Sequence, residues 1–403
     1  MTVCHWVLKF FNVVLSNVTQ RYLNIGIGQN DIELTKHYFE QSLTINIAFS
    51  FFILLIAETI GFWFVYNKLN IPENRHFAAM CVYHFSILSV ICSINQTTFL
   101  GAIVAHEKMN IYAYVGLFEG IARLLVIFLL QLCNVDHLIL YGAMMALISV
   151  ICTFVYMSFT KQFEEYHLKI CWDRSLVKEM GKFVGCNLFG CFAYSAGMQG
   201  TNVVMNLFFG PVVNAARGIA LQVSSVAIRF TESIMTSIKP QVIKSYAAND
   251  LPYMKILVKK GSKASLLLAL LISIPILFKT DYILYLWLGN VPKYAADFAQ
   301  LAIIESVIGA LINPLIVVSN ATGKIINTQV YGRLITLSSV LLSYLILRLC
   351  PKPIIPMYIL VVVQLGYWLY CLNDSYKQIN LNIKSYIKDI CGPSLALIIA
   401  MLV

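Results

Sequence analysis

Charged residues are scarce in this sequence of 403 residues. Asp, Glu, Lys and Arg make up 12% of the chain and hydrophobic residues 59%, whereas soluble domains carry about 25% charged residues. So few charges cannot cover the surface of a soluble protein. The composition therefore excludes a single-span receptor, a soluble enzyme and a nucleic-acid-binding domain, despite the formal net charge of +10. It predicts an all-α polytopic membrane protein, in which apolar helices satisfy their own backbone inside lipid.

Patterns of metal and disulfide chemistry are also lacking. The eleven cysteines include no CxxC pair and fall mostly within apolar runs, and the seven histidines form no HExxH motif. Buried free thiols are the expected state of such cysteines. We therefore predict no metal site, no cofactor and no catalytic residue.

Apolar runs separated by polar turns predict about 12 transmembrane helices. They lie at 3–22, 42–66, 77–104, 111–133, 138–160, 183–209, 212–238, 264–288, 295–320, 328–349, 355–373 and 390–403. If the loop at 21–41 is cytoplasmic, 19 of the 29 Lys and Arg lie on that side and seven on the other. This asymmetry predicts the orientation, because basic residues gather in cytoplasmic loops.

The chain contains a weak internal repeat. Residues close to 220 positions apart correspond in order and spacing, namely Asp31 with Asp250, Pro72 with Pro292 and Lys108 with Lys324. Each copy has an even number of spans, which predicts two helical lobes related by an axis along the membrane normal. Residue 1 corresponds to position 221, so the first helix of the first lobe is expected to be missing. The expected regions are a truncated N-terminal lobe at 1–160, a cytoplasmic amphipathic linker at 161–182, a C-terminal lobe at 183–376, and a cytoplasmic segment with a partial helix at 377–403.

Polar residues recur at helical spacing within several spans. Because polar groups inside a membrane usually face a bundle interior or a water-filled cavity, they are candidates for a transport pathway. The candidates for substrate binding are Lys9, Asn12, Arg123, Gln199, Asn202, Asn206, Arg217, Gln222 and Arg229, and those for ion or proton coupling are Glu58, Glu119, Glu232 and Glu305. An alternative remains open for two pairs, since Glu119 with Arg123 and Arg229 with Glu232 are spaced to neutralise each other on one helix.

Four stretches of the sequence resemble one family. They are 16–23 (SNVTQRYL), 103–110 (IVAHEKMN), 210–220 (GPVVNAARGIA) and 239–250 (KPQVIKSYAAND). They resemble the bacterial polysaccharide flippases, which are the O-antigen and capsule exporters of the multidrug/oligosaccharidyl-lipid/polysaccharide (MOP) superfamily. The resemblance implies a fold of two six-helix lobes, like that of the MATE transporters, in the inner membrane of a bacterium.

The resemblance also implies a function. The expected activity is alternating access that moves an undecaprenyl-pyrophosphate-linked oligosaccharide from the cytoplasmic to the periplasmic leaflet, beside polysaccharide polymerase and assembly proteins. The basic lumen positions of the family correspond to Lys9, Arg123 and Arg229, and arginine suits phosphate. Two alternatives stay open. A drug or cation exporter of the same superfamily would use the acidic candidates, and a polytopic glycan polymerase or transferase would need a catalytic cluster that the short outward loops do not offer.

Overall fold

The computed structural model describes residues 2–67, 75–132 and 136–402, with side chains described from residue 11 to residue 394 of these ranges except Cys391. All secondary structure in these ranges is helical. The chain divides into two compact units, Met1–Val184 and Gly185–Val403, and the boundary lies within α7 (Arg174–Ala247). The side chain of Lys9 and the whole of Pro72, both named in the predictions, lie outside the described part.

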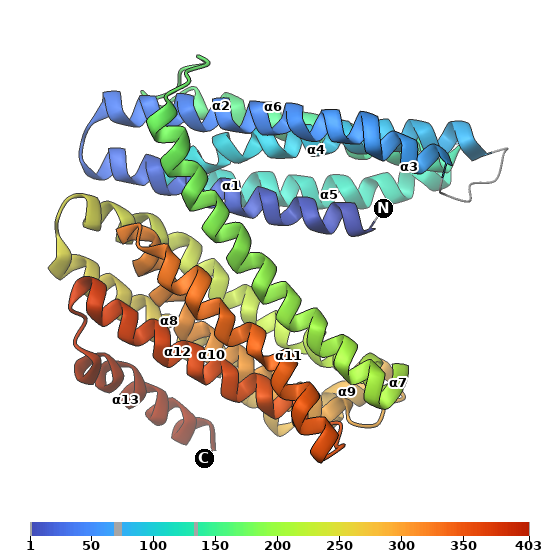
Figure 1. Ribbon diagram of the computed structural model, residues 1–403, viewed down its shortest axis with the longest axis vertical. Helices are drawn as coiled ribbons and strands as arrows, with labels where there is room; N and C mark the ends of the chain where they lie inside the picture. The colour runs from blue at the N-terminus through green and yellow to red at the C-terminus, as the bar shows by residue number, and fades with distance from the viewer. Residues whose placement is uncertain (1, 68–74, 133–135, 403) are drawn as a thin grey trace. The chain divides into compact units, whose positions relative to one another are not determined.

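The first unit is a helical bundle centred on one helix. Its elements are α1 (Thr2–Gly28), α2 (Ile32–Ile56), η1 (Ala57–Gly61), α3 (Phe62–Asn67), α4 (His76–Ala105), α5 (Met109–Leu132) and α6 (His137–Thr160) (Figure 1). Helix α4 packs against α1, α2 and α6. Phe39, Phe99, Ile103 and Tyr156 are buried in its core.

The second unit contains most of α7 and the helices that follow. Its other elements are α8 (Leu251–Phe278), α9 (Thr280–Leu288), α10 (Ala295–Thr322), η3 (Asn327–Tyr331), α11 (Gly332–Leu349), α12 (Ile355–Ile379) and α13 (Ile383–Leu402) (Figure 1). Helix α10 packs against α8 and α12, and α12 packs against α11. Met205, Ala216, Phe298 and Met357 belong to one buried core that joins α7, α10 and α12.

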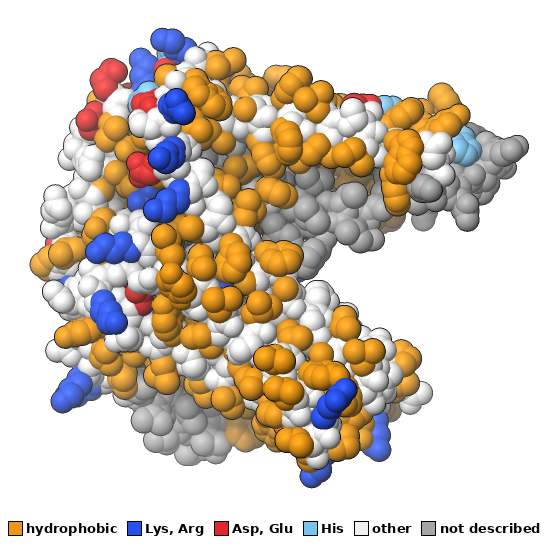
Figure 2. Space-filling model, viewed as in Figure 1, with side chains coloured by type: hydrophobic (Ala, Val, Ile, Leu, Met, Phe, Trp, Pro, Cys, Tyr) orange, Lys and Arg blue, Asp and Glu red, His pale blue; other side chains and the backbone are white. Residues whose placement is uncertain are grey.

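The helices have the length and surface of membrane spans. Within the described residues, nine helices are long and apolar enough to cross a bilayer. Large hydrophobic side chains cover much of the outer surface (Figure 2), among them Phe128 and Leu132 in α5, which are 61% and 79% exposed. Such surfaces are stable in lipid rather than in water. The structure confirms an all-α membrane protein, and within the described residues the predicted spans lie in helices, except that a turn at Lys279 divides the run at 264–288 between α8 and α9.

The two units share a turn at equivalent positions of the repeat. In the turn between α1 and α2, Asn30 has φ 53°, and Oδ1 of Asp31 accepts the N–H of Leu34 at 2.9 Å. In the turn between α7 and α8, Asn249 has φ 59°, and Oδ1 of Asp250 accepts the N–H of Tyr253 at 3.0 Å. Asparagine tolerates positive φ better than most residues, and aspartate is a favoured helix N-cap. The correspondence between Asp31 and Asp250 in the sequence therefore reflects one local structure.

The prediction of an amphipathic helix at 161–182 is wrong for the first half of this range. Residues 161–173 form turns and irregular chain, and α7 begins at Arg174. Side chains of α2 hold this segment by accepting hydrogen bonds from its backbone. The N–H of Cys171 donates to Thr44 Oγ1 and the N–H of Asp173 donates to Gln41 Oε1, both at 3.0 Å. Asp173 then caps α7, and hydrogen bonds from the hydroxyl and N–H of Ser175 and from the His37 ring lower its pKa to about 2.

Candidate functional site

Helix α7 reverses direction at Gly210 and so has two arms, residues 174–209 and 211–247. Gly210 has φ 76° and ψ −173°, a backbone conformation that is essentially restricted to glycine. Pro211 begins the second arm, where its fixed φ suits the first turn of a helix. The break that the sequence predicts between 183–209 and 212–238 is thus a hairpin, and it brings the polar residues of the two arms face to face.

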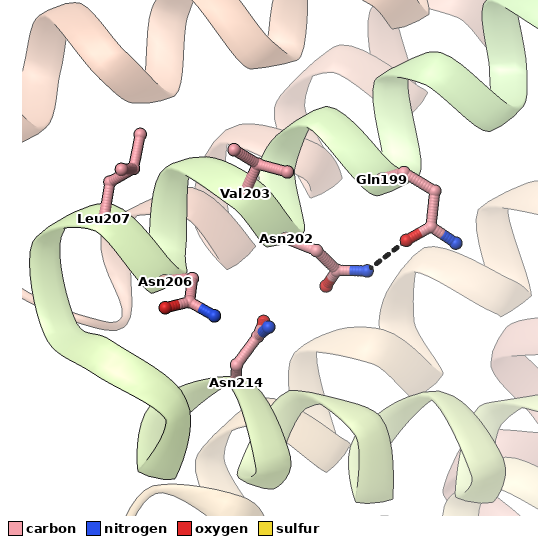
Figure 3. Close-up of a pocket in the computed structure, with 6 residues that line it drawn as sticks. All are labelled: Gln199, Asn202, Val203, Asn206, Leu207 and Asn214. Atoms are coloured by element: carbon pink, nitrogen blue, oxygen red, sulfur yellow. Dashed lines mark hydrogen bonds between the residues drawn. The ribbon is translucent and has the colours of Figure 1, made fainter. Parts of the chain in front are cut away.

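A pocket lined by four amide side chains and two apolar ones lies between these arms (Figure 3). Its volume is about 380 Å³. The lining residues are Gln199, Asn202, Val203, Asn206, Leu207 and Asn214. Most of them are amides, which both donate and accept hydrogen bonds. Asn202 Nδ2 donates to Gln199 Oε1 at 2.8 Å, and Asn206 and Asn214 point from opposite arms into the space between them. The pocket therefore offers neutral hydrogen-bonding groups.

Arg217 supports the pocket from behind. It is fully buried, and its Nη1 donates to Asn202 Oδ1 at 2.5 Å and to the carbonyl of Met198 at 3.3 Å. Within the described part of the chain, its Nε and Nη2 atoms have no hydrogen-bond partner. A buried guanidinium is costly unless it is compensated, and Glu305 of α10 lies close enough to interact with it electrostatically. Arg217 thus holds Asn202 in place through Nη1, while its Nε and Nη2 remain available as donors.

Tyr194 marks the place where several charged residues converge. Arg217, Glu232, Glu305 and Arg333 all interact electrostatically with it. The guanidinium carbon of Arg333 lies 5.0 Å from the ring centroid of Tyr194 and 4.8 Å from that of Tyr367, which is a cation–π geometry.

Arg333 was missed as a site residue. It lies in α11, within the predicted span at 328–349. The first arm of α7 approaches this helix closely, because an added Cβ at Gly200 would lie 2.7 Å from Val340 Cγ2.

The remaining candidates on α7 lie outside the pocket. Gln222, Arg229 and Glu232 are exposed side chains of the second arm. Among the described residues Arg229 and Glu232 form no salt bridge, although their charges interact. Arg229 therefore keeps a guanidinium that can contact a ligand.

The candidates in the first unit have separate partners. Asn12 Nδ2 donates to Ser93 Oγ at 2.5 Å, and its Oδ1 is buried without a partner in the described residues. Glu58, in η1, contacts His84 at 3.2 Å. Arg123 and Glu119 form an ion pair within α5, which is the neutralising arrangement that their spacing allows.

Similar solved structures identify the fold. No protein-family model and no curated protein matches the sequence. An outward-facing multidrug resistance MATE family transporter of the MOP superfamily matches with a TM-score of 0.78 at 12% identity, over 94% of this chain and 86% of that one. A MOP superfamily transporter from Pyrococcus furiosus gives the same values. The MATE transporter ClbM in complex with Rb⁺ matches with a TM-score of 0.71 at 15% identity, over 95% of this chain and 86% of that one. The chain therefore has the MATE-like fold of MOP superfamily transporters.

Proposed function

We propose that this chain is a MOP superfamily transporter that flips a polyprenyl-pyrophosphate-linked oligosaccharide across a bacterial inner membrane by alternating access. The amide pocket of α7 carries the proposal. Its neutral amides match sugar hydroxyls, which also donate and accept hydrogen bonds. No acidic side chain is among the residues that line it, whereas an organic cation would be recognised by carboxylates or aromatic faces.

The second arm of α7 extends the proposed binding surface toward the guanidinium of Arg229. Arg229 follows Asn214 by 15 residues, which corresponds to roughly 22 Å along a helix and about 60° around its axis. Both side chains thus lie on the same half of the arm, with Gln222 between them. We expect the sugars to contact the pocket and the diphosphate to contact Arg229, because a guanidinium binds phosphate through paired hydrogen bonds. A spacing of this length suits an oligosaccharide better than a single sugar.

A drug or cation exporter is the second candidate. Glu232 and Glu305, with Tyr194 and Tyr367 nearby, favour it, since acidic and aromatic groups suit cations. One similar structure binds Rb⁺, and the Pyrococcus furiosus transporter is described as having a pocket of reverse polarity that suggests a different function. The polarity of the pocket thus varies within the fold, so the fold alone does not determine the substrate.

Transport by the purified chain in lipid vesicles separates the two candidates. One vesicle set contains a polyprenyl-pyrophosphate oligosaccharide, and a glycosidase added outside reports the fraction that reaches the outer leaflet. A second set measures efflux of a fluorescent organic cation. We expect glycan flipping that Arg229→Gln strongly reduces. We also expect flipping to stay impaired in the double variant Arg229→Gln with Glu232→Gln, because the positive charge of Arg229 is still missing. Cation efflux without glycan flipping would overturn the proposal in favour of an exporter.

A further inference from the structure

A cluster of side chains that could ligate a metal ion lies in the first unit. His37 and Glu40 occupy positions i and i+3 of α2, and Cys171 belongs to the segment 161–173 that runs beside this helix. Their potential ligand atoms all lie within 4.8 Å of one another. His37 Nδ1 and Cys171 Sγ are 3.9 Å apart. Ligand bonds of about 2.1 Å to nitrogen and 2.3 Å to sulfur allow one ion to reach both atoms after a small adjustment.

Two further residues hold the potential ligands from outside. His37 Nε2 lies 3.4 Å from Asp173 Oδ2, so this ring is held through one nitrogen and presents the other to the thiol. Glu40 Oε1 lies 2.6 Å from His167 Nδ1. Metal-bound histidines almost always bond a carboxylate or carbonyl through their other nitrogen, and ligating carboxylates are hydrogen-bonded in turn. Both His37 and Glu40 thus have the kind of hydrogen-bond support that metal ligands use.

We propose that His37, Glu40 and Cys171 bind one Zn²⁺ ion, which fastens the segment 161–173 to α2 immediately before α7. One nitrogen, one oxygen and one sulfur donor form a set that zinc accepts, whereas Mg²⁺ and Ca²⁺ prefer oxygen donors only. Three protein ligands leave the fourth tetrahedral position to water. The side chain of Glu40 is 10% exposed, and those of His37 and His167 are 35% and 47% exposed. The ion can therefore enter from solvent and exchange.

The sequence does not predict this site, because the potential ligands are distant from one another in the chain. His37 lies near the start of α2, whereas Cys171 follows α6, and no short motif links them. The fold brings them together through backbone hydrogen bonds to Thr44 and Gln41, which align the segment with α2. The same contacts give the metal a structural consequence, because Asp173, which supports His37, also caps the first turn of α7. Zinc is thus expected to stabilise the start of the helix that continues into the second unit.

Binding of the metal to the full chain in detergent tests the proposal. The protein carries no affinity tag, is kept reduced with a phosphine, and is titrated with Co²⁺ and then with Zn²⁺. We expect one Co²⁺ per chain with a thiolate-to-cobalt charge-transfer band that Zn²⁺ abolishes. Cys171→Ser should remove the band, whereas Cys350→Ser, which changes another half-buried free cysteine, should retain it.

A conservative variant and a local readout keep the test decisive. Asp173→Asn should weaken zinc binding by about 10- to 100-fold, while the asparagine still caps α7. Hydrogen exchange at the amides of Cys171 and Asp173 should slow when Zn²⁺ is added, and Mg²⁺ should have no such effect. Absence of the band in the unchanged chain, or its persistence in Cys171→Ser, would overturn the proposal and leave a hydrogen-bonded cluster without a metal.

Discussion

The two units use the same turns but different polar residues. The turns that precede α2 and α8 both place an asparagine at positive φ and an aspartate at the N-cap. The turns that follow α4 and α10 also share positive φ, at Glu107 and at Gly323. By contrast, the polar candidates of the first unit have separate partners on α4 and α5, while Gln199, Asn202 and Asn206 of α7 line one pocket. The repeat therefore preserves the scaffold, and the candidate binding site belongs to one half.

The hairpin of α7 is expected to be the most sensitive feature of this contrast. Gly210→Ala places a side chain in a conformation that only glycine adopts readily, at a cost of about 3 kcal/mol. We expect a large loss of thermal stability in detergent together with loss of transport. Gly218→Ala is the matched control, because Gly218 lies within the second arm with open space around it. Equal effects of the two changes would show that the hairpin has no special role.

The asparagines of the two units should differ in their contribution. Asn202→Ala removes a hydrogen bond from a buried guanidinium, which we expect to lower the free energy of unfolding by about 2 kcal/mol. Asn12→Ala removes a hydrogen bond between neutral groups and should cost about 1 kcal/mol. Denaturant unfolding of both variants in the same detergent measures the difference. A larger loss at Asn12 than at Asn202 would contradict the supporting role of Arg217.

The shared turns should respond alike. Asp31→Ala and Asp250→Ala each remove the side-chain acceptor at a helix N-cap, and each should cost about 1 kcal/mol. Asparagine at either position should restore most of the loss, since it caps helices as well as aspartate does. Unfolding measurements on the four variants test whether the repeat is structural. A loss confined to one turn would argue against equivalent turns.

The ion pair in α5 should matter least. The side chains of Arg123 and Glu119 are 51% and 33% exposed, and pairs of this kind at i, i+4 contribute about 0.5 kcal/mol. We expect Arg123→Gln to change the free energy of unfolding by no more than this, and the double change with Glu119→Gln to leave glycan flipping intact. Complete loss of flipping in the double variant would return Arg123 to the substrate pathway, as the resemblance implies.

The helices were predictable because their signals are local. Long apolar runs indicate the spans, Gly210 with Pro211 indicates the break in α7, and Asp31 and Asp250 indicate helix starts. Each of these signals depends on residues that are neighbours in the sequence. The same local reasoning also grouped the amides of the first arm on one face.

The partners of these side chains were not predictable, because they depend on packing between distant segments. Arg217 is one of the binding candidates predicted from the sequence, yet its contact with Asn202 requires the two arms of α7 to fold back on each other. Arg333 stacks on Tyr194 and Tyr367 from two other helices. The segment 161–173 is not helical, and α2 supplies the acceptors for the N–H groups of Cys171 and Asp173, which the charged residues of the segment itself do not indicate.

The binding of a lipid-linked oligosaccharide by pocket variants tests the central claim most directly. Asn206→Leu removes an exposed amide that lines the pocket, and Ser233→Leu changes an exposed polar residue elsewhere on α7. With purified protein in detergent and a polyprenyl-pyrophosphate oligosaccharide as ligand, we predict that Asn206→Leu weakens binding about tenfold, which corresponds to one lost hydrogen bond. Ser233→Leu should leave the affinity unchanged. Equal affinity of the unchanged chain and Asn206→Leu would contradict a sugar-binding role for the pocket between the two arms of α7.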